Sequence, residues 1–167
     1  RKNTKSKTVK AIVNPSPTIN LLIVTARPNE AHDVNYRTIQ RPLVELIQKA
    51  KLKVKPHILR PGTYESFVRH LDKVGAKYYH IIHFDLHGAL LDYPTYKSLQ
   101  KEAAAVTFSN WSFQNTDFTS TYALPELPAY EDKKAFLFFE STKKGTAIPV
   151  EAGQLATLLE NKQVPVV

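Results

Sequence analysis

The segment Ile19–Thr25, INLLIVT, is an almost unbroken apolar run, and it decides the predicted fold. A strand with one face in water alternates apolar and polar residues, whereas a strand buried on both faces does not. This segment therefore predicts a strand that is buried on both faces of a parallel sheet. The sequence Ala-Arg-Pro-Asn that follows predicts the end of the strand.

Apolar strands and amphipathic helices alternate along the rest of the chain. Further strands are expected at about 52–59, 78–84, 135–140 and from 163 onward, and helices at about 35–51, 64–74 and 150–160. This alternation predicts an α/β fold with three layers, in which a mostly parallel sheet has helices on both faces. Residues 90–133 are expected to form a long irregular insertion. It would be a functional flap, a partner-binding surface, or a surface loop without a function.

Three residues mark helix boundaries in this pattern. Thr63 is expected to cap the N-terminus of the helix at 64–74, and Gly75 is expected to end it. Pro42 falls inside the first helical pattern, so a kink or a later start is expected there.

Composition restricts the class of protein. The chain is 43% hydrophobic and 23% charged and has no cysteine, which excludes a collagen-like, disulfide-rich or wholly disordered chain. No apolar run is long enough to span a membrane, and no signal peptide is visible, so a cytoplasmic location is expected. Because the sequence lacks an initial methionine and stops in an apolar strand, we expect it to be a piece of a longer polypeptide.

The net charge of +8 is unevenly distributed. Residues 1–10 carry five basic side chains and no acid, whereas the rest of the chain carries 18 basic and 15 acidic side chains. A nucleic-acid surface would place its excess positive charge on the folded part. We therefore expect residues 1–17 to be a basic linker, with a nucleic-acid arm as the alternative, and residues 18–167 to form one domain.

Candidate functional residues lie where predicted strands end, because ligands of open parallel sheets bind beyond the carboxyl ends of strands. His87 follows the strand at 78–84, and an imidazole is suited to proton transfer at neutral pH. Gly88 permits close backbone approach and offers an N–H to a developing oxyanion. The alternative is a loop histidine without a role.

Two charged residues share this predicted sheet edge. Arg27 would bind a carboxylate or phosphate, or would be an ordinary exposed arginine in a turn. Asp85 would orient a neighbour or cap a loop. His80 and His83 should point to opposite faces of a strand, so no metal site is predicted, and no cofactor motif such as GxGxxG or a P-loop is present.

The run at 77–90, KYYHIIHFDLHGAL, resembles the histidine motif of CHAT domains, which are bacterial caspase-like cysteine peptidases often attached to TPR repeats. Four other segments are similar to the same family in the same order: 21–47, 57–71, 135–141 and 149–167. The resemblance covers about residues 19–90 and 135–167.

This resemblance implies a caspase/haemoglobinase-like fold, truncated before its C-terminal part, and a Cys-His dyad that hydrolyses protein or peptide substrates. It implies that His87 is the catalytic histidine, with Gly88 beside it, and that the cysteine lies just beyond Val167, so that these residues alone should be inactive. By analogy with caspases, Arg27 would contact an acidic substrate side chain, and Asp85 is expected to take part in substrate binding with it. Partners would be TPR or other regulatory regions of the same parent chain.

Two other classes of function remain open on the sequence. A non-catalytic signalling or scaffold module would use the same fold without the cysteine. A flavodoxin-like small-molecule binder would place a ligand at the strand ends and would not depend on His87.

Overall fold

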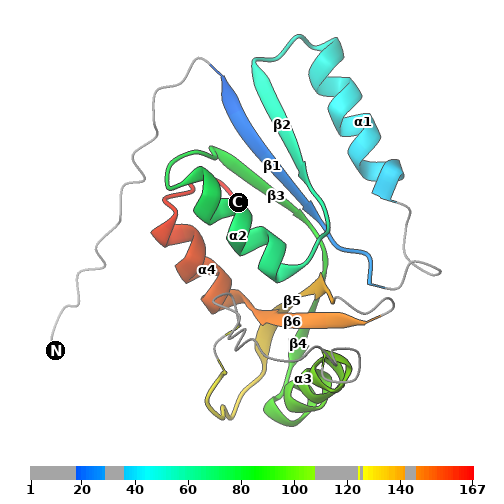
Figure 1. The fold of residues 1–167 in the computed structure, drawn as a ribbon, viewed down its shortest axis with the longest axis vertical. Helices are drawn as coiled ribbons and strands as arrows, with labels where there is room; N and C mark the ends of the chain where they lie inside the picture. The colour runs from blue at the N-terminus through cyan, green and yellow to red at the C-terminus, as the bar shows by residue number, and fades with distance from the viewer. Residues whose placement is uncertain (1–17, 29–35, 108–123, 125, 142–145) are drawn as a thin grey trace, which may run out of the picture.

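The fold is described from a computed structural model of the chain, for residues 18–28, 36–107, 124, 126–141 and 146–167. Its elements are, in order, β1 (Ile19–Thr25), α1 (Tyr36–Lys49), β2 (Val54–Leu59), α2 (Tyr64–Val74), β3 (Ile81–Asp85), β4 (His87–Leu91), α3 (Tyr93–Thr107), β5 (Lys134–Glu140), β6 (Ala147–Glu151) and α4 (Ala152–Asn161). The strands form a three-strand parallel sheet, ordered β2-β1-β3, and a separate three-strand antiparallel sheet, ordered β4-β5-β6 (Figure 1).

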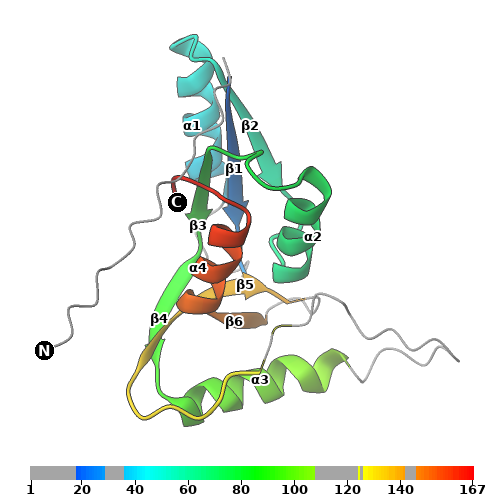
Figure 2. The same ribbon diagram turned by 90° about the vertical axis from the view of Figure 1, so that its left-hand side faces the viewer.

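The prediction that β1 is buried on both faces of a parallel sheet is confirmed, and the strand lies at the centre of that sheet. This strand pairs in parallel with both β2 and β3. Leu22 and Val24 belong to the core that α2 and α4 cover, whereas Leu21 and Ile23 pack with Ile47 of α1. Helices therefore cover both faces of the parallel sheet, as expected, and Figure 2 shows the sheet between α1 and the other two helices.

The predicted limits of α2 are also confirmed. The Thr63 hydroxyl accepts a hydrogen bond from the Ser66 N–H at 3.1 Å, which satisfies a donor of the first turn. Gly75 ends the helix with a φ of 82°, and its N–H donates to the Leu71 carbonyl at 3.0 Å. A positive φ is accessible to glycine without steric cost, which explains why the helix stops at this residue.

The expectation of one mostly parallel sheet is wrong for the strand at 135–140. This strand, β5, pairs antiparallel with β4 on one side and β6 on the other. Its apolar run is compatible with either kind of pairing, and the two strands beside it are poorly marked in sequence. Gly88 weakens the strand signal of β4, and Pro149 does the same for β6, where a helix was expected from residue 150.

The insertion at 90–133 is not wholly irregular, because α3 occupies its first part. Pro94 lies in the first turn of this helix, where the missing N–H costs nothing. Tyr96 of α3 packs with Leu91, Leu127 and Phe136 against the antiparallel sheet. Residues 108–123 and 125 of the insertion lie outside the described residues, as does the predicted linker at 1–17.

The strand expected from residue 163 is reduced to a single bridge beside β3. Val166 pairs in parallel with Ile81, and the Ile82 N–H donates to the Val166 carbonyl at 3.0 Å. The end of the chain therefore runs alongside β3 and in the same direction, on the side of β3 that faces away from β1.

Candidate functional site

His87 and Gly88 lie at the start of β4, directly beyond the carboxyl end of β3. Only Leu86 separates the two strands, and Figure 2 shows them as one extended ribbon that passes from the parallel to the antiparallel sheet. In the antiparallel register, His87 faces Phe138 and Gly88 faces Leu137. Both residues are exposed. The structure thus brings the predicted pair to an accessible strand end, and their catalytic roles stay predictions.

The direction of the Gly88 peptide group follows from its surroundings. A Cβ on Gly88 would lie 3.3 Å from the Phe136 carbonyl oxygen, so that carbonyl is on the β4 side of β5. Phe136 faces Ala89 in the register, and successive residues of a strand turn their N–H and C=O groups to opposite sides. Gly88 and Leu90 are therefore the residues whose backbone groups point away from β5.

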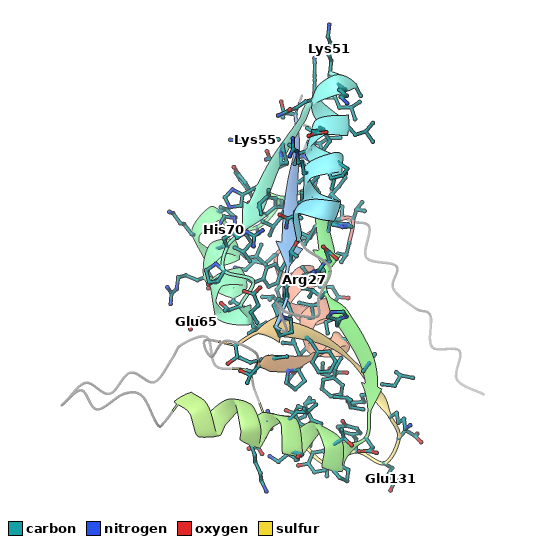
Figure 3. All side chains as sticks on the ribbon, turned by 90° about the vertical axis from the view of Figure 1, so that its right-hand side faces the viewer. Arg27, Lys51, Lys55, Glu65, His70 and Glu131 are labelled. Atoms are coloured by element: carbon teal, nitrogen blue, oxygen red, sulfur yellow. The ribbon has the colours of Figure 1, made fainter. Side chains whose placement is uncertain are left out.

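Arg27 and Asp85 are brought together, because each one follows or ends a strand at the same edge of the parallel sheet. A guanidinium nitrogen of Arg27 lies 2.6 Å from an Asp85 carboxylate oxygen, and the two side chains are 10% and 15% exposed. A second guanidinium nitrogen donates to the backbone carbonyls of Asp85 and Ala26, at 2.9 and 3.0 Å. Figure 3 shows Arg27 where the two sheets meet. The two side chains therefore bond to each other at this edge of the parallel sheet. The predicted substrate contacts of both residues stay predictions.

Glu140 completes this edge and was missed by sequence reasoning. One carboxylate oxygen accepts the Arg27 N–H and the other accepts the Gly62 N–H, each at 3.0 Å. Its own N–H donates to the Gly62 carbonyl at 2.9 Å. The acid at the end of the apolar run Ala-Phe-Leu-Phe-Phe-Glu was the available signal. We call Arg27, Gly62, Asp85 and Glu140 the sheet junction, because they join the parallel sheet to β5.

A second polar contact ties α1 to the same edge. The Gln40 amide nitrogen donates to the Thr25 hydroxyl, and its amide oxygen accepts from the Arg60 guanidinium at 3.0 Å. Gln40 and Thr25 are both buried. Because their polar atoms bond each other, this contact explains how polar groups are tolerated at the buried end of β1.

A histidine pair away from the junction was also missed. The rings of His57 on β2 and His70 on α2 stack with centroids 4.5 Å apart, and His70 Nε2 lies 2.5 Å from the Tyr79 hydroxyl. Burial lowers the pKa of His70, and the neighbouring charges of His57 and Lys73 lower it further. Burial raises the pKa of Tyr79. Figure 3 shows His70 on the helix beside β2.

The other histidines do not converge. His80 precedes β3 and its Nδ1 accepts the Asn20 N–H at 3.1 Å, whereas His83 lies on β3 and is exposed. Within the described residues, no group of three histidine, cysteine or carboxylate side chains has the arrangement of a metal site. The arrangement at the strand ends offers proton transfer by His87 and an outward N–H at Gly88.

Comparisons with known protein families, with curated proteins and with solved structures return no match for this chain. In the part of the chain that the structure describes, no helix is both long and apolar enough to cross a membrane.

Proposed function

We propose that this chain is part of a caspase-like cysteine endopeptidase domain of the CHAT type, whose cysteine follows Val167 in the parent chain. The observation that carries the proposal is the parallel bridge between Val166 and Ile81. In the same register, the fourth residue after Val166 is level with Asp85, because Asp85 is the fourth residue after Ile81. A cysteine a few residues beyond Val167 would thus arrive beside the carboxyl end of β3, near His87.

The chemistry follows from these two groups. The cysteine thiolate attacks the scissile carbonyl carbon, and the resulting oxyanion accepts a hydrogen bond from the Gly88 N–H. The C–N bond then breaks, and the His87 imidazolium gives its proton to the leaving amine. Water attacks the acyl-enzyme, with His87 as base, and the thiolate is released with the carboxylic acid product. The exposure of His87 and the outward direction of the Gly88 N–H support these roles.

The test uses the parent protein and a matched pair of histidine variants. His87 and His83 are both exposed, and only His87 has a proposed role in the reaction. We expect His87→Ala to reduce cleavage of a fluorogenic peptide library at least about 100-fold, since general acid–base catalysis contributes at least that factor. His83→Ala should retain activity. Equal turnover in His87→Ala and wild type would refute the role of His87.

One observation favours the alternative of a non-catalytic scaffold on the same fold. Arg27 and Asp85, the two charges expected to contact substrate, are paired with each other and largely buried. Labelling of the parent protein with iodoacetamide, read by mass spectrometry, separates the two functions. A peptidase requires a reactive thiol within a few residues of Val167, and its absence would support the scaffold.

A further inference from the structure

Positive charge is concentrated in one continuous part of the folded chain. Residues 36–77, which run from the start of α1 to just beyond the end of α2, contain ten lysine and arginine side chains and three carboxylates. The rest of the chain after residue 10 contains eight basic and twelve acidic side chains. The folded part is therefore strongly asymmetric in charge, and its positive side is built by α1, β2 and α2.

The carboxylates of this segment are engaged by cations outside the turn from α1 into β2. The ion pairs are Glu45 with Arg41, Glu65 with Arg69 and Asp72 with Lys162. Four exposed lysines follow one another along the turn and the start of the strand: Lys49, Lys51, Lys53 and Lys55. Among the described residues, no carboxylate forms an ion pair with these four lysines. Their positive charge is thus available to an anionic partner.

The turn that carries the lysines has a defined backbone. The Lys51 N–H donates to the Gln48 carbonyl at 3.1 Å, and the Leu52 N–H donates to the Ile47 carbonyl at 3.2 Å. This pair of hydrogen bonds is a Schellman motif, in which Lys51 takes a left-handed φ of 49°. Glycine is the residue that this conformation favours, so the geometry of the turn does not itself call for a lysine.

An exposed leucine lies among the lysines. The side chain of Leu52 is 55% exposed, and that of Leu46 on α1 is 62% exposed. Single exposed apolar side chains are common, but Leu52 stands between Lys51 and Lys53 at one end of the molecule. Figure 3 shows Lys51 at this end and Glu131 at the opposite end. We call Lys49, Lys51, Leu52, Lys53 and Lys55 the basic tip.

Two structural explanations account for part of the basic tip. The dipole of α1 favours cations at its C-terminus, which explains Lys49 and Lys51. Exposed lysine on an edge strand opposes pairing with a further strand, which explains Lys55 on β2. Neither explains an exposed leucine between lysines. Cations beside an exposed leucine match an anionic membrane surface, where headgroups attract the lysines and the apolar side chain reaches the acyl boundary.

We propose that the basic tip docks end-on against the surface of an anionic lipid bilayer. The lysines contact the headgroups, and Leu52 enters the boundary between headgroups and acyl chains. Each lysine close to such a surface strengthens binding about fivefold. A nucleic acid would contact the same lysines, but it gains from aromatic and polar side chains rather than from a leucine. Residues 1–10 carry positive charge only, so they offer no carboxylate to the tip.

This docking does not depend on the proposed peptidase activity. The basic tip lies at the amino end of β2, and the strands of its sheet run in the same direction. His87 follows β3 beyond the opposite, carboxyl end of that sheet. A bilayer at the tip therefore leaves the proposed active site facing away from the lipid. Docking is measured as binding, on the 167-residue chain.

Vesicle binding tests the role of charge. The chain is sedimented with vesicles of phosphatidylcholine, either alone or with about one third phosphatidylserine. We expect at least about tenfold tighter binding to the anionic vesicles, and Lys49→Ala/Lys53→Ala should weaken it at least about tenfold. Lys101→Ala/Lys133→Ala is the matched control, because it removes the same charge from exposed positions on α3 and before β5. This control should weaken binding less than about threefold, since those positions lie far from the tip.

A second pair of variants tests the role of the leucine. Leu52→Ser should weaken binding to the anionic vesicles about fivefold. Leu90→Ser alters a side chain of similar exposure on β4 and should bind like wild type. The chain has no cysteine, so Leu52→Cys provides a single site for an NBD fluorophore. Its emission should shift to the blue when vesicles bind, whereas the same label at Leu90→Cys should not respond.

The fluorophore measurement also separates the tip from residues 1–10, whose positive charges could bind vesicles on their own. Four outcomes would overturn the proposal: equal binding to the two kinds of vesicle, equal weakening by the two lysine pairs, unchanged binding of Leu52→Ser, and an unshifted label at Leu52→Cys on bound protein. Circular dichroism checks the fold of each variant. If Lys49→Ala/Lys53→Ala does not fold, the label at Leu52→Cys decides the question.

An oligonucleotide tests the other class of anionic partner. The probe is a fluorescein-labelled single-stranded DNA, read by fluorescence anisotropy. If it binds the wild-type chain, binds Lys49→Ala/Lys53→Ala at least about tenfold more weakly, and vesicles do not bind, the tip belongs to a nucleic-acid surface. That result would overturn the membrane assignment. Vesicle binding that depends on the tip, with DNA binding that does not, would support it.

Discussion

The sheet junction and the outer edge of β4 lie on either side of Leu86, but they differ in burial and in hydrogen bonding. At the junction, the Arg27 and Asp85 side chains are almost buried, and Glu140 accepts two backbone N–H groups. In β4, four of the five residues are exposed, and the outward backbone groups belong to Gly88 and Leu90. The polar groups of the junction hold two sheets together, whereas the backbone groups of Gly88 and Leu90 point away from β5.

The largest expected effect compares one glycine from each region. In Gly62→Ala, the new Cβ would lie 2.1 Å from the Thr25 carbonyl oxygen, so the backbone must move. We expect the free energy of unfolding to fall by about 3 kcal/mol or more. In Gly88→Ala, the nearest atom is 3.3 Å away, and the loss should stay below about 1 kcal/mol. Urea denaturation measures both, and similar losses would mean that the two regions are packed alike.

The next effect concerns the Arg27–Asp85 pair. Asp85→Ala leaves a largely buried guanidinium without its carboxylate, and we expect a loss of about 3 kcal/mol in the free energy of unfolding. Arg27→Ala should cost a similar amount. The double variant should cost clearly less than the two single losses together, because the uncompensated charge is gone. Strict additivity in this double-mutant cycle would show that the pair does not stabilise the junction.

Sequence reasoning predicted the elements around the junction but not the contacts that form it, because only the elements are encoded in local sequence. The burial of β1 on both faces, the Thr63 cap and the Gly75 stop are encoded in local sequence, so they were predicted correctly. The pairing of β5 was not, because an apolar run such as KAFLFFE does not specify its neighbours. The partners of Arg27 were equally inaccessible, since Asp85 and Glu140 reach it only through the tertiary fold.

The same limit applies to the candidate site. The position of His87 beyond a strand end followed from the apolar run before it, and it required no tertiary information. That β4 is an edge strand depends on which strands pair, so the sequence HGALL gave no sign of it. The stacked histidines show the same gap, because His57 and His70 lie on different elements and are brought together by the packing of α2 on the sheet.

A smaller effect is expected from pH at the stacked pair of His57 on β2 and His70 on α2. The pKa of His70 is lowered in the fold, below the ordinary value of 6.5, so the unfolded chain binds more protons as the pH falls through that value. The stability contributed by the neutral ring is therefore present above pH 6.5 and decreases below it. Because the ring is partly exposed, the loss should be on the order of 0.5 kcal/mol.

Thermal unfolding between pH 7.5 and 5.5 measures this loss. His70→Gln should remove part of the pH dependence, because the glutamine side chain does not titrate in this range. His83→Gln alters an exposed histidine on β3 and serves as the matched control, which should behave like wild type. A pH profile that is the same in His70→Gln and wild type would contradict the assignment to the histidine pair.

The smallest effect on stability is expected at the exposed part of β4. Leu90→Lys places a charge on a side chain that is 65% exposed, so we expect the free energy of unfolding to change by less than about 0.5 kcal/mol. Ile58→Lys makes the same change on β2, where the side chain is 38% exposed, and should have a similarly small effect in urea denaturation. If Leu90→Lys destabilises the chain as strongly as Asp85→Ala, β4 belongs structurally to the junction, and the contrast between a closed and an open region does not hold.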